Sequence, residues 1–403
     1  MAERDAKRLK TQKDGSPRIF KTFKRDCVKS TDLLLSAVSA LERGLEGLSF
    51  AMLKVDTSNA QKQHSFVDVS IEYSPWNMFG DEEPHSGCNI GALFSDGLEV
   101  LKSYADMDSP KVPKLNLVQR TALQNLLEFL SKKIDHETLF EEISSEEHWC
   151  VVLAQHLLSK LAVSSEYTIA SYPGLRIGDT KCMCKQNDDL VGVIGDTSFG
   201  LENGWHGNTD IIFEGADVQV ACMRDEEDQD DLSVSSMEME ASDFNFKDFK
   251  QIVAQTIVFS FLQKKTCGNK LKNSLIPGIG MSKKKLIVVF YDAENDILLS
   301  TKPILLFGDK EIVYSALVFL WLTLNYKEFC TGIPDALKEF KASFLPDPVL
   351  HQMYIERVER PLHIDHTKEE KAFPWSDKNV RTVAGKKPEV VLSDLSDLSE
   401  DES

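Results

Sequence analysis

The stretch that most constrains the fold lies between residues 205 and 265, where two short apolar runs precede a helical pattern. Residues 209–213 and 217–223 are rich in β-branched and apolar side chains, and the short sequence EGA separates them. This composition predicts a β-hairpin. Residues 246–265 carry apolar side chains at helical spacing and predict an amphipathic helix. We therefore expect a strand, turn, strand and helix in succession, within an α/β fold.

The register of this hairpin decides which of its side chains share a face. If Gly215 and Ala216 form the turn, Ile212 lies opposite Gln219, and side chains alternate between the two faces from there. One face then carries Asp210, Ile212, Glu214, Asp217, Gln219 and Ala221. The other face carries Ile211, Phe213, Val218, Val220 and Cys222, and we expect it to be core.

The order of an Asp-bearing strand, a turn, a strand with acid-x-polar and a helix resembles the catalytic core of the PD-(D/E)XK nuclease-like superfamily. Residues 146–291 support the resemblance, because their patterns read helix, strand, strand, strand, helix, strand. The resemblance implies that Asp210 and Asp217 bind Mg²⁺ or Mn²⁺ and orient a water, with Gln219 at the family's Lys position. It also implies that Gln255 faces this site. The activity it implies is metal-dependent cleavage of nucleic acid.

A non-enzymatic interaction protein is the alternative, because Gln219 cannot deliver positive charge to a developing oxyanion. In this reading an inactive nuclease-like fold is a scaffold and the tails recruit partners. The chain ends in PEVVLSDLSDLSEDES, where Val390, Val391 and Leu392 precede Ser and Asp residues. This segment resembles a SUMO-interacting motif, which adds a strand to its partner and sets acids against a basic groove. A simple acidic solubilising tail has the same composition.

Composition changes divide the chain into four parts. Residues 1–30 are rich in Lys and Arg and predict a flexible basic arm. Residues 31–145 predict a mainly helical region with a loop insertion at 54–91. Residues 146–345 predict the α/β core, a mixed sheet flanked by helices, with an acidic loop at 225–243. Residues 346–403 are Pro-rich and acidic and predict a disordered tail.

The formal net charge of −18 argues against broad adhesion to nucleic acid, although the acids concentrate in two segments and a local basic groove stays open. No apolar run approaches the roughly 18 residues of a membrane span, and the stretch ALVFLWLTL predicts a buried helix instead. The first residues hold no apolar core of a signal peptide. These features predict a nuclear or cytoplasmic protein that neither enters a membrane nor is secreted.

The cysteines are expected to be reduced thiols in such a compartment. Cys182 and Cys184 form a C-x-C, and His148 and Cys150 form an H-x-C earlier in the chain. These four residues could hold zinc, whereas scattered thiols without a metal are the plainer alternative.

Overall fold

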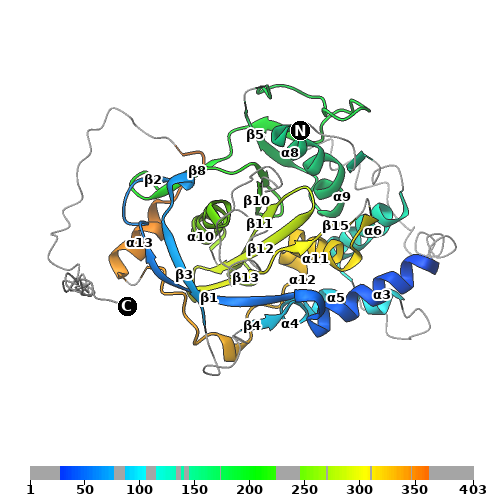
Figure 1. The fold of residues 1–403 in the computed structure, drawn as a ribbon, viewed down its shortest axis with the longest axis horizontal. Coiled ribbons are helices and arrows are strands. Elements are labelled where there is room, and N and C mark those ends of the chain that lie inside the picture. Colours follow the sequence, from blue (N-terminus) through cyan, green and yellow to red (C-terminus); the bar gives the residue numbers. More distant parts are fainter. Residues whose placement is uncertain are drawn as a thin grey trace, which may run out of the picture. The chain divides into compact units, whose positions relative to one another are not determined.

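A computed structural model gives the structure of the chain (Figure 1). It describes residues 28–76, 87–105, 115–132, 138–139, 145–172, 174–223, 246–268, 271–308, 311–345 and 347–362. The basic arm up to residue 27, the acidic loop 225–243 and the tail beyond residue 362 lie outside the described residues. All described residues belong to one compact unit.

A mixed β-sheet of eleven strands runs through the described part of the chain. Its main path is β3 (Ile71–Pro75), β1 (Ser49–Ser58), β13 (Ile297–Thr301), β12 (Lys285–Asp292), β11 (Leu275–Met281), β10 (Val218–Cys222), β9 (Ile211–Phe213), β5 (Tyr167–Ala170) and β6 (Val193–Gly195). Of the two remaining strands, β4 (Gly87–Asn89) pairs with β1 and β14 (Ile304–Leu305) pairs with β12. The pairs β10–β11 and β5–β6 are parallel, and the other pairs are antiparallel. The predicted α/β class with a mixed central sheet is therefore confirmed.

Two small sheets and a set of helices complete the described structure. The small sheets are β2 (His64–Ser65) with β8 (Trp205–Asn208) and β7 (Ser198–Gly200), and β15 (Phe307–Gly308) with β16 (Glu311–Ile312). The α-helices are α3 (Val28–Arg43), α4 (Ile90–Leu93), α5 (Ser95–Ala105), α6 (Leu117–Ser131), α8 (Glu146–Leu153), α9 (Ser159–Leu161), α10 (Phe246–Cys267), α11 (Tyr314–Leu324), α12 (Tyr326–Phe329) and α13 (Pro348–Arg357). Ala154–Leu158 is a π-helical segment, η3, that joins α8 to α9, and the 3₁₀ turns are η1 (Leu45–Gly47), η2 (Phe66–Asp68) and η6 (Asp335–Leu337).

Helices cover both faces of the sheet, as the aromatic contacts of β12 demonstrate. The Phe290 ring lies 5.5 Å from that of Phe50, which in turn lies 5.8 Å from Phe319 of α11. The next side chain, Tyr291, lies 5.8 Å from Phe261 of α10. Because successive side chains of a strand point to opposite faces, α10 covers one face and α11 the other (Figure 1).

The strongly apolar segment of the sequence forms α11, as predicted. Ten of its residues, Ser315 to Leu324, are buried, and the Trp321 indole N–H donates to the carbonyl of Ala122 in α6 at 2.9 Å. The helix is apolar on all sides because sheet and helices surround it. Across the described ranges, no helix combines the length and apolar character needed to cross a membrane.

The region expected to be a loop at 54–91 contributes strands to the main sheet. β1 begins shortly after α3 and pairs with β3 on one side and β13 on the other. The predicted loop insertion at 54–91 is wrong, because this segment holds the end of β1 together with β3 and β4. One neighbour of β1 in the sheet is β13, which comes from residues 297–301, and no local pattern reveals a pairing over such a distance in sequence.

Strand β11 is also absent from the sequence prediction, because Pro277, Gly278 and Gly280 have low strand propensity. The small residues are needed because α10 lies directly on this strand. A Cβ atom on Gly278 would stand 2.0 Å from the Thr256 hydroxyl oxygen, and one on Gly280 would stand 2.2 Å from the Ile252 Cδ1. β11 is the strand that follows α10 and runs parallel to β10.

Helix α13 and the segment after it lie where a disordered tail was predicted from residue 346 onward. Asp347 caps the helix by accepting hydrogen bonds from the N–H groups of Val349 and Leu350. The buried Tyr354 hydroxyl donates to the carbonyl of Ala60 at 2.8 Å and accepts from the N–H of Trp205 at 3.1 Å. This stretch therefore belongs to the core.

The expectation of reduced cysteines is wrong for one pair. Cys150 of α8 and Cys222 of β10 are joined by a disulfide, with their Cα atoms 6.2 Å apart. Helix α8 packs on the face of β10 that carries Cys222, and this packing brings together two residues that are 72 positions apart. Among the described residues, Cys88, Cys182, Cys184, Cys267 and Cys330 form no disulfide.

Candidate functional site

The hairpin β9–β10 has the register that the sequence predicted. Ile212 pairs with Gln219 and Phe213 with Val218, and residues 214–217 form the turn. All five residues of β10 are buried, because α10 covers the face expected to carry the site while α8 covers the other. The polar side chains of the hairpin therefore need partners within the protein.

Asp210 lies immediately before β9, and its carboxylate has protein donors on both oxygens. Oδ1 accepts a hydrogen bond from the Tyr172 hydroxyl, and Oδ2 accepts one from the backbone N–H of Cys222 at 2.6 Å. In the hairpin register the residue opposite Asp210 is Ala221. The neighbouring strand thus places no carboxylate beside Asp210.

Asp217 lies in the turn with a positive φ of 52°. Its Oδ2 forms an ion pair with the Lys327 ammonium group of α12 and lies 3.7 Å from the Cys267 sulfur. Asp217 and Ala221 are four positions apart in the sequence, a span of about 13 Å along a strand. Two ligands of one Mg²⁺ ion lie within about 4 Å of each other. The hairpin therefore does not bring Asp210 and Asp217 together around a single ion.

Gln219 is fully buried in a network of hydroxyl groups. Its Oε1 accepts from the Thr209 hydroxyl at 2.8 Å, and its Nε2 donates to the Thr256 hydroxyl of α10 at 3.3 Å. The Thr209 hydroxyl oxygen also lies 3.0 Å from the carbonyl oxygen of Val220, and the Thr256 hydroxyl donates to the carbonyl of Ile252 at 2.7 Å. The network ties the hairpin to α10.

Gln255 lies one residue before Thr256 on α10 and is buried. Its Nε2 donates to the carbonyl of Asn208 at 3.0 Å, two residues before Asp210. Its Oε1 has no hydrogen-bond partner among the described residues. Gln255 thus contacts the chain leading into β9 through a backbone carbonyl.

Glu214, at the other end of the turn, forms a two-pronged ion pair. Both Arg360 terminal nitrogens lie 2.7 Å from its carboxylate oxygens, and the Thr168 hydroxyl donates at 3.1 Å. Burial alone would raise the pKa of Glu214, but the bonds from Arg360 and Thr168 hold it below its usual value. This pair fastens the segment after α13 to the hairpin.

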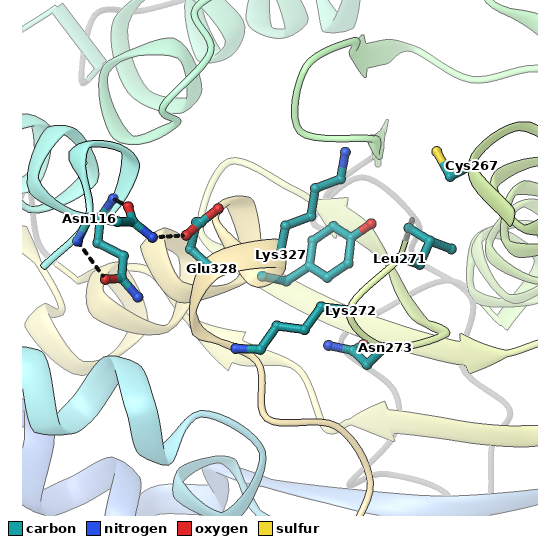
Figure 2. Close-up of a pocket in the computed structure, with 9 residues that line it drawn as sticks. Asn116, Cys267, Leu271, Lys272, Asn273, Lys327 and Glu328 are labelled. Atoms are coloured by element: carbon teal, nitrogen blue, oxygen red, sulfur yellow. Dashed lines mark hydrogen bonds between the residues drawn. The ribbon is translucent and has the colours of Figure 1, made fainter. Parts of the chain in front are cut away.

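A pocket of about 520 Å³ adjoins the turn, and sequence reasoning did not find it (Figure 2). It is lined by Asn116, Gln119, Cys267, Leu271, Lys272, Asn273, Tyr326, Lys327 and Glu328. The Asn116 side chain donates to Glu328 at 2.9 Å across its wall. Burial raises the pKa of Tyr326 well above its usual value, so this phenol stays protonated. The lining residues come from segments far apart in the sequence, which share no local signal.

Sequence reasoning found only part of a second group, the buried cluster of His156, Cys182 and Cys184. The predicted zinc set named both cysteines but chose His148 and Cys150 from α8. Cys150 bonds to Cys222, so it is unavailable as a thiolate ligand. The histidine beside the cysteines is His156, two turns further along the same helical segment.

Comparison of the chain with protein-family models, with curated proteins and with solved structures found no match.

Proposed function

We propose that this chain is a non-enzymatic interaction protein whose core resembles a nuclease fold in its order of elements. The order from α8 onward supports the resemblance. Helical residues 146–161 lead to β5, then to the hairpin β9–β10, then across α10 to β11, which lies parallel to β10. Short strands β6, β7 and β8 interrupt this order between β5 and β9.

One observation carries the proposal: the three hairpin residues expected to act on a metal and a water belong to three separate sets of protein contacts. Asp210 bonds to Tyr172 and a backbone N–H, Asp217 pairs with Lys327, and Gln219 is sealed beneath α10. A metal-dependent hydrolase needs carboxylates that converge on one ion with room for water and substrate. These contacts stabilise a fold and leave no such arrangement at the hairpin.

Recruitment by the tail is the second part of the proposal. Val390, Val391 and Leu392, which lie outside the described residues, would add a strand to the sheet edge of a SUMO protein. The acids that follow would face its basic groove.

The catalytic half is tested by incubating the full chain with labelled single- and double-stranded DNA and RNA, with Mg²⁺, Mn²⁺ or EDTA. We expect no cleavage above buffer. The matched variants are Asp210→Asn and the exposed Asp335→Asn. Metal-dependent cleavage that Asp210→Asn abolishes and Asp335→Asn retains, with both variants folded, would refute the proposal and establish a divergent nuclease.

The recruitment half is tested by titrating a SUMO protein into the full chain. Replacing Val390, Val391 and Leu392 together by Ala should weaken binding at least tenfold. Replacing Leu395 and Leu398 by Ala is the matched control in the same tail and should weaken binding much less. If the two variants bind the SUMO protein with equal affinity, the tail is only an acidic solubilising segment.

A further inference from the structure

The cluster of His156, Cys182 and Cys184 has the chemistry and the spacing of a metal site. One imidazole nitrogen of His156 and the sulfurs of Cys182 and Cys184 lie within 4.8 Å of one another, and His156 Nε2 lies 3.4 Å from the Cys182 sulfur. All three side chains are buried, with exposed fractions of 2%, 1% and 7%. Within the described ranges, this is the only group of three or more such side chains close enough to share an ion.

The distances between the ligand atoms of a tetrahedral zinc ion can be compared with those in this cluster. With Zn–S near 2.3 Å and Zn–N near 2.1 Å, two ligand atoms lie about 3.6 Å apart for a sulfur and a nitrogen, and about 3.8 Å for two sulfurs. The observed 3.4 Å contact is close to the first value. We propose that His156, Cys182 and Cys184 bind a zinc ion, with solvent at the fourth position.

The loop that carries both cysteines is shaped to present them together. Lys181 and Asp189 form an antiparallel bridge at its base, and the N–H of Cys182 donates to the carbonyl of Asp188 at 2.7 Å. Inside it, the N–H of Asn187 donates to the carbonyl of Cys184 at 2.9 Å. The sulfurs of Cys182 and Cys184 lie within 4.8 Å of each other, so both can face one ion.

The helical side of the cluster is equally well positioned. His156 lies in the π-helical segment Ala154–Leu158, a distortion that is frequent at functional sites. Its neighbour Gln155 holds the loop in place: Nε2 donates to the carbonyl of Asp189 at 3.0 Å, and Oε1 accepts from the N–H of Val191 at 3.1 Å. The Tyr167 hydroxyl donates to the same oxygen at 2.6 Å and fixes this amide.

Ligand chemistry selects zinc among the common metals. Thiolate and imidazole ligands suit Zn²⁺, whereas Mg²⁺ and Ca²⁺ prefer oxygen ligands. One Zn²⁺ with two thiolates and a neutral imidazole carries no net charge, which suits a buried position. The ion would fasten the cysteine loop to the helical segment that begins at α8.

The test begins with metal analysis of the full-length chain, purified under reducing conditions from zinc-supplemented medium. We expect close to one zinc per chain. His156→Gln, Cys182→Ser and Cys184→Ser should each weaken zinc binding at least tenfold in competition with a chromophoric chelator. The matched controls are His148→Gln, on the same helical segment, and Cys88→Ser, and both should bind zinc like the wild type. Far-ultraviolet circular dichroism checks that each variant is folded.

A measurement on the wild type alone covers the case in which the variants fail to fold. Zinc at 100 times its Kd should raise the melting temperature of the stripped protein by about 4 °C. Cobalt should also give the absorption bands of a thiolate-bound ion. The proposal would be overturned if the purified protein holds no zinc and added zinc does not raise its melting temperature. It would also be overturned if His148→Gln loses zinc. A third refuting result is metal-free protein that zinc does not stabilise and in which mass spectrometry finds a Cys182–Cys184 disulfide.

Discussion

Replacing Gly278 by Ala should destabilise the protein, because this glycine leaves room for the buried Gln219 amide. Gly278 pairs with Gln219 across β10 and β11. An added Cβ would stand 2.0 Å from the Thr256 hydroxyl oxygen and 2.3 Å from Gln219 Nε2, so that both groups must shift.

The magnitude follows from three contributions. Overpacking of a tight core costs about 1–3 kcal/mol, and losing the hydrogen bond between Gln219 and Thr256 costs about 1 kcal/mol. The reduced freedom of the unfolded chain offsets about 0.4–1 kcal/mol. We therefore expect Gly278→Ala to lower the free energy of unfolding by about 1–3.5 kcal/mol.

Urea denaturation followed by tryptophan fluorescence measures this change. Gly308→Ala is the matched control, because its nearest heavy atom to an added Cβ is 3.6 Å away, an ordinary contact. It should change stability by no more than about 0.5 kcal/mol. Combining Gly278→Ala with Thr256→Ala removes the nearest clashing atom, so the double variant should be more stable than the sum of the single changes by about 1 kcal/mol.

The reasoning fails if Gly278→Ala lies within about 0.5 kcal/mol of the wild type, or if the two changes are additive. Either result would mean that α10 can move away from β11 at little cost. Gln219 would then no longer be held away from solvent by α10, and the main support for a non-enzymatic function would weaken.

Further predictions concern the C-terminal part of the chain. Tyr354→Phe should cost about 1–3 kcal/mol, because the carbonyl of Ala60 and the N–H of Trp205 lose a buried partner; a thermal melt unchanged from the wild type would contradict the docking of α13. Arg360→Ala should lower stability at neutral pH by a small amount, because Glu214 is partly exposed. Since the folded pKa of Glu214 is depressed, the difference in stability from the wild type should vanish as the pH falls through that pKa. Denaturation at several pH values measures this difference, and a difference that does not change with pH would count against the ion pair. In the acidic tail, Ser399→Ala should abolish phosphorylation of the serines three and six positions upstream by an acid-directed kinase, since phosphate at each serine supplies the acidic group that the preceding one needs; undiminished phosphate in mass spectra would rule out this order.

Several elements could be derived from sequence alone because their signals are local. Helical spacing of apolar residues indicated α10, and a continuous apolar run indicated α11. Two β-branched runs around a short turn indicated the hairpin with Ile212 opposite Gln219. Such patterns reflect the period of a helix or strand that is buried on one side, and neighbouring residues suffice to reveal them. The α/β class with a mixed sheet followed from the same signals.

Tertiary structure decided the rest, because the determining contacts join residues far apart in sequence. β11 is a strand despite Pro277 and Gly278, since α10 packs on it too closely for larger side chains. The carboxylate of Asp217 pairs with Lys327, 110 positions away, and the Cys182 sulfur meets His156 instead of the histidine that spacing had suggested. Residue types and spacing identified side chains capable of metal chemistry. Which of them meet depends on how helices and strands pack, and packing is determined by burial of apolar surface over the whole core.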